Sequence, residues 1–219
     1  AATVCTKVPT EIQLRKGNEF TKVTLRKPGG IDIDFDRNDI RTSVAEAQQE
    51  AIKDANRNYA SNYTIIIQVK SPTQPNITFI DMPGFTTNES QYEILKMAKD
   101  RVEQYPGTLI LHVVRGDQDY DSVLGNDFIR DTNKNKITVV THLDKYDDDD
   151  TKLDLTIKSN KEIFAVLGNI ETDHEEEEKK LKELNCLKSR FDIRIGSKQL
   201  TQHIQKRLEE HLERQIPKA

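Results

Sequence analysis

The run from Asn76 to Phe85 ends in residue types that could bind a metal ion and a phosphate. Its apolar, β-branched residues predict a buried parallel strand, and Asp81 stands at the carboxyl end of that strand. Ligands bind at the carboxyl ends of strands in open α/β sheets. An Asp there can hold Mg²⁺, and Gly84 can offer its N–H to a terminal phosphate because no Cβ blocks the approach. The pattern also allows an ordinary strand-to-loop turn, since Met82-Pro83-Gly84 contains turn residues.

A second strand-end motif follows further along the chain. An apolar strand is predicted over 136–140, and Thr141-His142-Leu143-Asp144 stands at its end. The carboxylate of Asp144 can accept two hydrogen bonds from a guanine edge, at N1–H and at the 2-amino group. Adenine offers no such pair, so Asp144 would select GTP over ATP. A third motif, Gly168-Asn169-Ile170, follows a strand predicted over 161–167.

The composition limits the class of protein. The chain has 219 residues, enough for one α/β domain with a sizeable core. Charged residues make up 32% of it and the net charge is −4, which argues against strong general affinity for nucleic acid or anionic membrane. We expect neither a membrane span nor a signal peptide. The two cysteines, Cys5 and Cys186, lack metal-type spacing, so we expect a reducing, cytoplasmic compartment.

The pattern of apolar residues predicts strands and helices that alternate in the second half of the chain. Strands are expected over 10–15, 21–26, 63–69, 76–81, 108–114, 136–140 and 161–167. Helices are expected over 43–58, 91–104, 122–131, 154–158 and 175–183, with a final helix from Ser197 to a stop at Pro217. The alternation predicts parallel βαβ units with right-handed crossovers. The strands over 63–69 and 76–81 are close enough in sequence to be antiparallel neighbours.

Four local features refine this interpretation. Ser43 and Glu46 fit a capping box at the start of a surface helix. His112 lies in an apolar run, which favours a packed histidine over a catalytic one. The acidic run Asp147–Asp150 is more typical of a solvated loop than of a Ca²⁺ site. The final helix carries one apolar stripe that we expect to be buried: Leu200, Ile204, Leu208 and Leu212.

Together these motifs resemble the GTPase domain of the dynamin superfamily. Thr3–Ile12 is similar to the family's first switch and the strand after it, and Asp81-Met82-Pro83-Gly84 to its Asp-x-Pro-Gly second switch. Thr141-His142-Leu143-Asp144 is similar to the Thr-Lys-x-Asp base motif. Phe164–Asn169 is similar to the strand and Asn that close over the base and ribose, and Ile195–Pro217 to the last helix and its Pro hinge.

The resemblance implies an α/β fold of three layers, like that of the phosphate-binding-loop GTPases. It has a mixed, mostly parallel sheet with helices on both faces. The resemblance implies one GTPase domain over 1–219, with the final helix and hinge at 197–219. It implies GTP and Mg²⁺ as ligands, with Thr6 and Asp81 at the metal, and it assigns no catalytic residue. The implied nucleotide-binding residues are Thr6, Asp81, Gly84, Thr141, His142, Asp144, Gly168 and Asn169.

The sequence departs from the family in two places. The phosphate-binding loop, Gly-x-x-x-x-Gly-Lys-Ser/Thr, does not occur in these residues, and His142 stands where the family has Lys. We therefore expect an amino-terminally incomplete domain that lacks the first strand and the phosphate-loop helix. The missing strand would leave a gap beside the strand that ends at Asp81. Either the sheet re-forms without that strand, or a second copy of the chain fills the gap in an intertwined dimer.

Three functions are compatible with these observations. The first is part of a dynamin-like GTPase, whose family couples GTP hydrolysis to self-assembly and membrane remodelling; this chain alone would then be inactive. The second is a pseudo-GTPase that acts as a dimerisation or interaction module. The third is an unrelated α/β domain with chance motifs. We expect self-association as a homodimer, membrane contact only through other domains of a parent protein, and no nucleic-acid partner.

Overall fold

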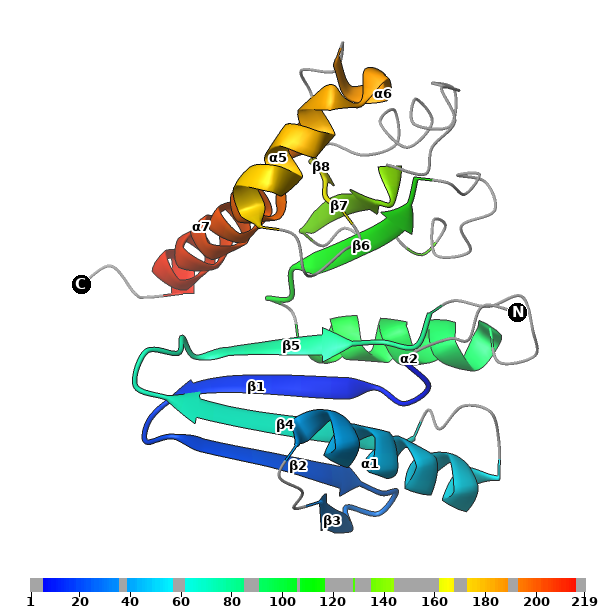
Figure 1. The fold of residues 1–219 in the computed structure, drawn as a ribbon. Helices are drawn as coiled ribbons and strands as arrows, with labels where there is room; N and C mark the ends of the chain where they lie inside the picture. The colour runs from blue at the N-terminus through cyan, green and yellow to red at the C-terminus, as the bar shows by residue number, and fades with distance from the viewer. Residues whose placement is uncertain are drawn as a thin grey trace. The chain divides into compact units, whose positions relative to one another are not determined.

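The computed structural model describes residues 6–35, 39–56, 62–84, 91–105, 107–116, 128, 135–143, 162–167, 173–188 and 193–215. The chain divides into two compact units, Ala1–Arg101 and Val102–Ala219. Each unit contains a β-sheet with helices packed against it (Figure 1).

The sheet of the first unit has five strands in the order β3-β2-β4-β1-β5. β1 and β4 are parallel, whereas β2 pairs antiparallel with β3 and β4, and β5 pairs antiparallel with β1. The strands are β1 (Thr10–Lys16), β2 (Phe20–Arg26), β3 (Asp32–Phe35), β4 (Thr64–Ser71) and β5 (Ile77–Asp81). Four of them confirm the sequence predictions. The short β3 was not predicted, because two of its four residues are Asp.

The prediction that the strands now seen as β4 and β5 are neighbours is wrong. β1 lies between them and pairs with both, parallel to β4 and antiparallel to β5. The link of residues 72–76 contains Pro72 and Pro75, which do not suit a two-residue hairpin turn. A link of this length can instead cross over one strand, because neighbouring strands are only about 5 Å apart.

The prediction that β5 is a buried parallel strand is also wrong. β5 is an edge strand that runs antiparallel to its one neighbour among the described residues, β1. Phe79, in the middle of β5, is 39% exposed. Sequence alone could not distinguish the two cases, because a short apolar run is compatible with either. The other edge of β5 pairs with no strand among the described residues.

Helix α1 (Ile40–Ala55) begins earlier than predicted, and the capping box at Ser43 is wrong. The N-cap is Asp39, whose Oδ2 accepts hydrogen bonds from the N–H and the hydroxyl of Thr42, at 2.9 and 2.8 Å. These two hydrogen bonds keep the pKa of Asp39 below its ordinary value. Ser43 lies inside the first turn and is buried. The helix ends before Asn56, which adopts the left-handed conformation.

The core of the first unit lies between α1 and one face of its sheet. Ala47 and Ala51 of α1 pack there with apolar side chains of the central strands, chiefly Val23, Leu25, Ile65 and Ile67. The thin apolar face of α1 is sufficient because alanine allows a helix to approach a sheet closely. Helix α2 (Gln91–Gln104) confirms the helix predicted over 91–104.

The sheet of the second unit has four strands in the order β6-β7-β8-β9, and all of them are parallel. The strands are β6 (Ile110–Arg115), β7 (Lys136–Thr141), β8 (Ile163–Ala165) and β9 (Ile193–Ile195). This confirms the parallel arrangement predicted for the second half of the chain. β8 is shorter than the predicted strand over 161–167. β6, like β5, is an edge strand among the described residues.

Helices pack on both faces of this second sheet. Helices α5 (His174–Glu183) and α6 (Asn185–Lys188) cover one face through Leu181, Cys186 and Leu187. Helix α7 (Ser197–Gln215) covers the other face, where Leu200 and Ile204 pack against Phe164 and its neighbours. These contacts confirm the final helix and the first half of its predicted apolar stripe. The side chain of Leu212 lies outside the described residues.

Several predictions fall outside the described residues. They are the helix over 154–158, the acidic run Asp147–Asp150, Pro217, and most of the helix over 122–131. Phe128 of that last segment is described, and it is helical and buried. Among the helices that the structure describes, none combines the length and the apolar character needed to cross a membrane.

His112 is a packed histidine, as predicted. It is 6% exposed, and it lies opposite Thr138 in the register between β6 and β7. Among the described residues, neither nitrogen of His112 has a hydrogen-bond partner, and the same is true of Thr138 Oγ1. Burial, with a smaller contribution from Lys136, lowers the pKa of His112 to about 4. His112 is therefore neutral in the folded chain at neutral pH.

This burial predicts a pH-dependent stability. An unfolded histidine takes up a proton near pH 6.5, whereas His112 in the folded chain does so near pH 4. Proton uptake by the unfolded state should therefore lower the free energy of unfolding by up to about 3 kcal/mol between those pH values. Urea unfolding across this range should show that loss in the wild type and much less of it in H112L. H174Q, which changes an exposed histidine, should behave as the wild type; an equal loss in all three would contradict the prediction.

Candidate functional site

The two residues predicted to hold Mg²⁺ lie together at one end of the first sheet. Thr6 Oγ1 donates a hydrogen bond to Asp81 Oδ2, with the two oxygens 2.8 Å apart. The contact follows from the pairing of β1 with β5, because Thr10 at the start of β1 lies opposite Asp81 at the end of β5. The loop before Thr10 therefore brings Thr6 to the Asp81 carboxylate, although the two residues are far apart in sequence.

Buried contacts fix the loop that carries Thr6. The side chains of Val8 and Pro9 are fully buried, and Pro9 O accepts a hydrogen bond from Ile65 N at 2.9 Å. Lys7 N donates to Gln48 Oε1 of α1 at 3.1 Å. The loop is thus attached to both β4 and α1, which leaves Thr6 little freedom to move away from Asp81.

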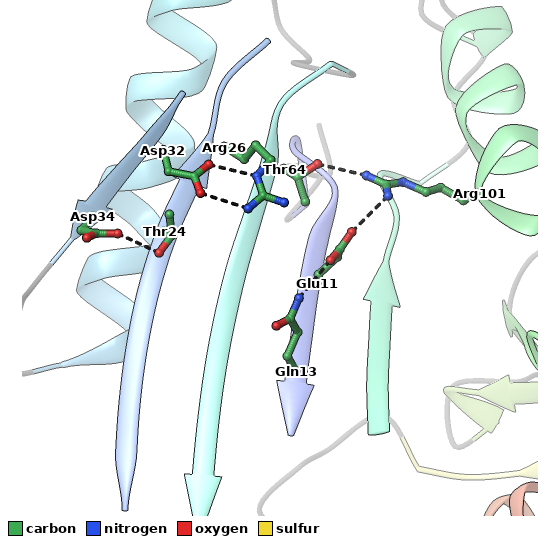
Figure 2. A network of polar contacts seen from close by, with 8 residues as sticks. All are labelled: Glu11, Gln13, Thr24, Arg26, Asp32, Asp34, Thr64 and Arg101. Carbon is green, nitrogen blue, oxygen red and sulfur yellow. Dashed lines mark hydrogen bonds and ion pairs between the residues drawn. The ribbon is translucent and has the colours of Figure 1, made fainter. Parts of the chain in front are cut away.

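The opposite face of the first sheet is polar, and it holds helix α2 through Arg101 (Figure 2). The Arg101 guanidinium donates to Glu11 Oε1 on β1 and to Thr64 Oγ1 on β4, both at 3.0 Å. Gln13 supports Glu11 with a further hydrogen bond of 3.3 Å. Since α2 follows the Asp81–Gly84 turn in the chain, this ion pair fixes the far end of the second-switch segment to the two parallel strands.

Two cross-strand polar pairs lie further along that face. Arg26 binds both carboxylate oxygens of Asp32 at 2.9 Å, and Thr24 donates to Asp34 at 2.9 Å (Figure 2). The Arg26 guanidinium holds the pKa of Asp32 below its ordinary value, and Lys22 has the same effect on the pKa of Asp34. These carboxylates are already paired, so they are poor candidates for a metal site.

Thr6 and Asp81 fit a hard divalent cation. A hydroxyl and a carboxylate are both oxygen ligands, which Mg²⁺ prefers, and Asp81 is exposed to solvent. No group of three or more His, Cys, Asp or Glu in the described part of the chain is placed to hold a metal ion. Such a two-oxygen site suits Mg²⁺, which is usually held by one or two protein ligands together with phosphate oxygens and water.

Gly84 ends the described part of the second switch. A Cβ built on Gly84 would meet no atom within 4 Å, and its φ angle is not in the left-handed region. Neither packing nor backbone conformation therefore requires glycine here. The open space at the Cβ position is compatible with the close approach of a phosphate.

In the second unit, Thr141 and His142 lie together at the carboxyl end of β7. Thr141 Oγ1 is 3.0 Å from His142 Nδ1 and 3.3 Å from Val114 O. His142 adopts the left-handed conformation, with φ of 57°, which is strained for a residue that is not glycine. Strained residues of this kind concentrate at functional sites, so the angle is an independent observation in favour of this strand end.

Tight packing holds the β7 turn in place. Gly116 N donates to Thr141 O at 2.7 Å, and Leu143 is buried in the core of the second unit. A Cβ on Gly116 would lie 2.6 Å from Leu143 Cδ2 and 3.3 Å from Thr141 O. Glycine at position 116 is therefore required by close packing against the turn that precedes Asp144.

Three predicted site residues, Asp144, Gly168 and Asn169, lie outside the described residues. The strands that precede them in the chain, β7 and β8, are described. β7 and β8 are parallel neighbours, so their carboxyl ends lie at the same edge. This is the edge at which ligands bind in open α/β sheets.

Sequence reasoning missed Glu177. The helix predicted over 175–183 was assigned no site residue, yet Glu177 in α5 is only 4% exposed. Its Oε1 accepts a hydrogen bond from Leu167 N at 3.0 Å, and its Oε2 accepts one from Ser197 N at 2.8 Å. Only the spacing of Glu177 from Leu181, four residues on the same helix face, could have indicated burial.

The two layered α/β units, with polar residues at strand ends, are consistent with the fold class of the phosphate-binding-loop GTPases. The model of the dynamin family matches residues 1–146, about two thirds of the chain, and the chain belongs to this family. Its fold is that of the family's GTPase domain. The matched part contains Thr6, Asp81, Gly84 and the base motif up to Asp144, whereas Gly168 and Asn169 lie beyond it. No curated protein matches the chain.

The two glycines beside the site predict opposite effects of substitution. G116A should lower the free energy of unfolding by roughly 1–3 kcal/mol, because the added methyl overpacks the Leu143 turn. G84A should leave it within about 0.5 kcal/mol of the wild type, because nothing occupies that space. Chemical denaturation of the three proteins checks both values. A larger loss in G84A than in G116A would contradict the geometry of both turns.

Proposed function

We propose that this chain supplies the switch and base-recognition residues of a guanine-nucleotide site that binds GTP with Mg²⁺. The observation that carries the proposal is the 2.8 Å contact between Thr6 Oγ1 and Asp81 Oδ2. These are the two oxygens that the family resemblance assigns to the metal, and they come together from segments far apart in sequence. Membership of the dynamin family supports the same ligands.

Each site residue has a role that its chemistry supports. Thr6 and Asp81 would hold Mg²⁺, which when bound neutralises charge on the phosphates. Gly84 would donate its N–H to the terminal phosphate, and Asp144 would read the guanine edge. Thr141, Gly168 and Asn169 would line the base and ribose side, and His142 would stack there without the reach of the family's Lys.

We further propose that this chain by itself hydrolyses GTP poorly or not at all. The Gly-x-x-x-x-Gly-Lys-Ser/Thr sequence, whose backbone N–H groups and Lys hold the phosphates, does not occur in the 219 residues. In the parent protein, hydrolysis coupled to self-assembly and membrane remodelling would need that loop and further domains. A cytoplasmic location accords with the low cysteine content of the chain, two in 219 residues.

Titration with a fluorescent guanine nucleotide in Mg²⁺ tests the proposal. The wild type should bind, and D144A should weaken binding by about tenfold or more because the base loses a charged acceptor. D81N should weaken binding to a similar degree and remove its Mg²⁺ dependence. D34N, which changes a carboxylate already paired on the polar face, is the matched control and should bind as the wild type does. No binding at millimolar protein and nucleotide would contradict the proposal.

A second candidate function is a pseudo-GTPase that self-associates, and the edge of β5 that pairs with no described strand favours it. Residues 77–81 contain neither Pro nor Lys, and Asp81 is their only charge, so little protects this edge against pairing. Antiparallel pairing of two β5 strands about Phe79 would form a closed two-fold dimer and cover that exposed ring. The occupant of the edge is then a second copy of the chain.

Light scattering after size-exclusion chromatography tests this second candidate. The wild type should elute as a dimer, and F79K should elute as a monomer because a charged side chain blocks edge pairing. I31K changes another exposed apolar residue, 63% exposed at the β2–β3 turn, and should remain a dimer. A monomeric wild type at the highest concentration that stays in solution would contradict self-association along β5.

A further inference from the structure

Glu177 is a buried carboxylate that joins three elements of the second unit. It lies on α5 and is 4% exposed. One of its oxygens accepts from the backbone N–H of Leu167, just after β8, and the other accepts from the N–H and hydroxyl of Ser197, at the start of α7. A buried charge is costly unless it is fully hydrogen-bonded, and these three donors meet that requirement.

The position of Glu177 at the start of α7 suits a carboxylate. The N-terminal end of α7 carries a partial positive charge, so a carboxylate at Ser197 is stabilised there. Ser197 gives its only proton to Glu177 Oε2, and His174 Nδ1, 2.8 Å from the same hydroxyl, is therefore the donor in that second contact. Gly196, with φ of 94°, makes the turn that aims Ser197 N at the carboxylate.

Glu177 holds the chain at the carboxyl end of β8, which is one of the strand ends of the proposed site. β8 is short, and Gly196 N donates to Ala165 O at 2.9 Å while Val166 N donates to Val140 O at 2.9 Å. Leu167 is the next residue along the chain, and its amide is held by Glu177 instead of by a strand. Glu177 therefore determines where the chain stands immediately before Gly168 and Asn169.

We propose that Glu177 is a positioning residue for recognition of the guanine base, acting through the Leu167 amide and the start of α7. The proposal rests on the proposed guanine-nucleotide function. Glu177 itself touches no nucleotide. Its role is to hold the Leu167 amide, which follows the three-residue strand β8.

The preference for GTP over ATP, as a ratio of dissociation constants, tests this role. The amide oxygen of E177Q can still accept the hydrogen bond from Leu167 N–H. Its NH₂ group, however, would face the N–H and hydroxyl of Ser197, which are also donors. We expect E177Q to lower the ratio by about tenfold, and S197A to lower it by a smaller factor because only the hydroxyl contact is lost. E176Q, an exposed glutamate one position earlier in α5, should keep the ratio of the wild type.

The ratio separates positioning from general destabilisation. A loss of stability alone would weaken GTP and ATP binding equally and leave the ratio unchanged. If E177Q fails to fold by circular dichroism, the ratio in S197A decides. A wild type that prefers GTP together with variants that keep the full preference would overturn the role of Glu177. A wild type without any preference for GTP would instead overturn the proposed function on which that role depends.

Discussion

The antiparallel pairing of β1 with β5 is the constraint on which the metal end of the site depends. Thr10 lies opposite Asp81, so the loop that precedes β1 arrives at the end of β5. Side chains alternate between the two faces of a strand, so a shift of one residue would turn Asp81 to the other face. The contact between Thr6 and Asp81 exists because this register is set by apolar partners such as Ile12 and Phe79.

The described residues that would touch a ligand are exposed or half-buried, and buried residues beside them fix their places. Val8 and Pro9 hold the loop of Thr6, Leu143 holds the β7 turn, and Glu177 holds the end of β8. Supporting contacts of this kind are needed because the position of a side chain on a loop is poorly defined unless buried contacts hold the loop backbone. Each anchor lies within one unit of the chain.

Sequence predicted the chemistry better than the arrangement of the strands. Asp81, Thr141 and His142 stand at strand ends as expected, because apolar runs followed by polar turns are local signals. The exposure of β5 and its separation from β4 depend on strand order, which no local pattern encodes. Asp39 and not Ser43 caps α1, since both residues fit a cap and only the path of the preceding chain decides. The burial of Glu177 depends on donors from Leu167 and Ser197, which are distant in sequence.

Replacement of Mg²⁺ by Mn²⁺ in an NMR experiment tests the central claim most directly, because Mn²⁺ broadens the signals of nuclei close to it. With a guanine nucleotide present, the backbone amide signals of Thr6 and Asp81 should lose intensity first. Those of Asp32 and Asp34, whose carboxylates are already paired with Arg26, Lys22 and Thr24, should stay sharp. Broadening centred on those aspartates or on Asp147–Asp150, with Thr6 and Asp81 unaffected, would contradict the account.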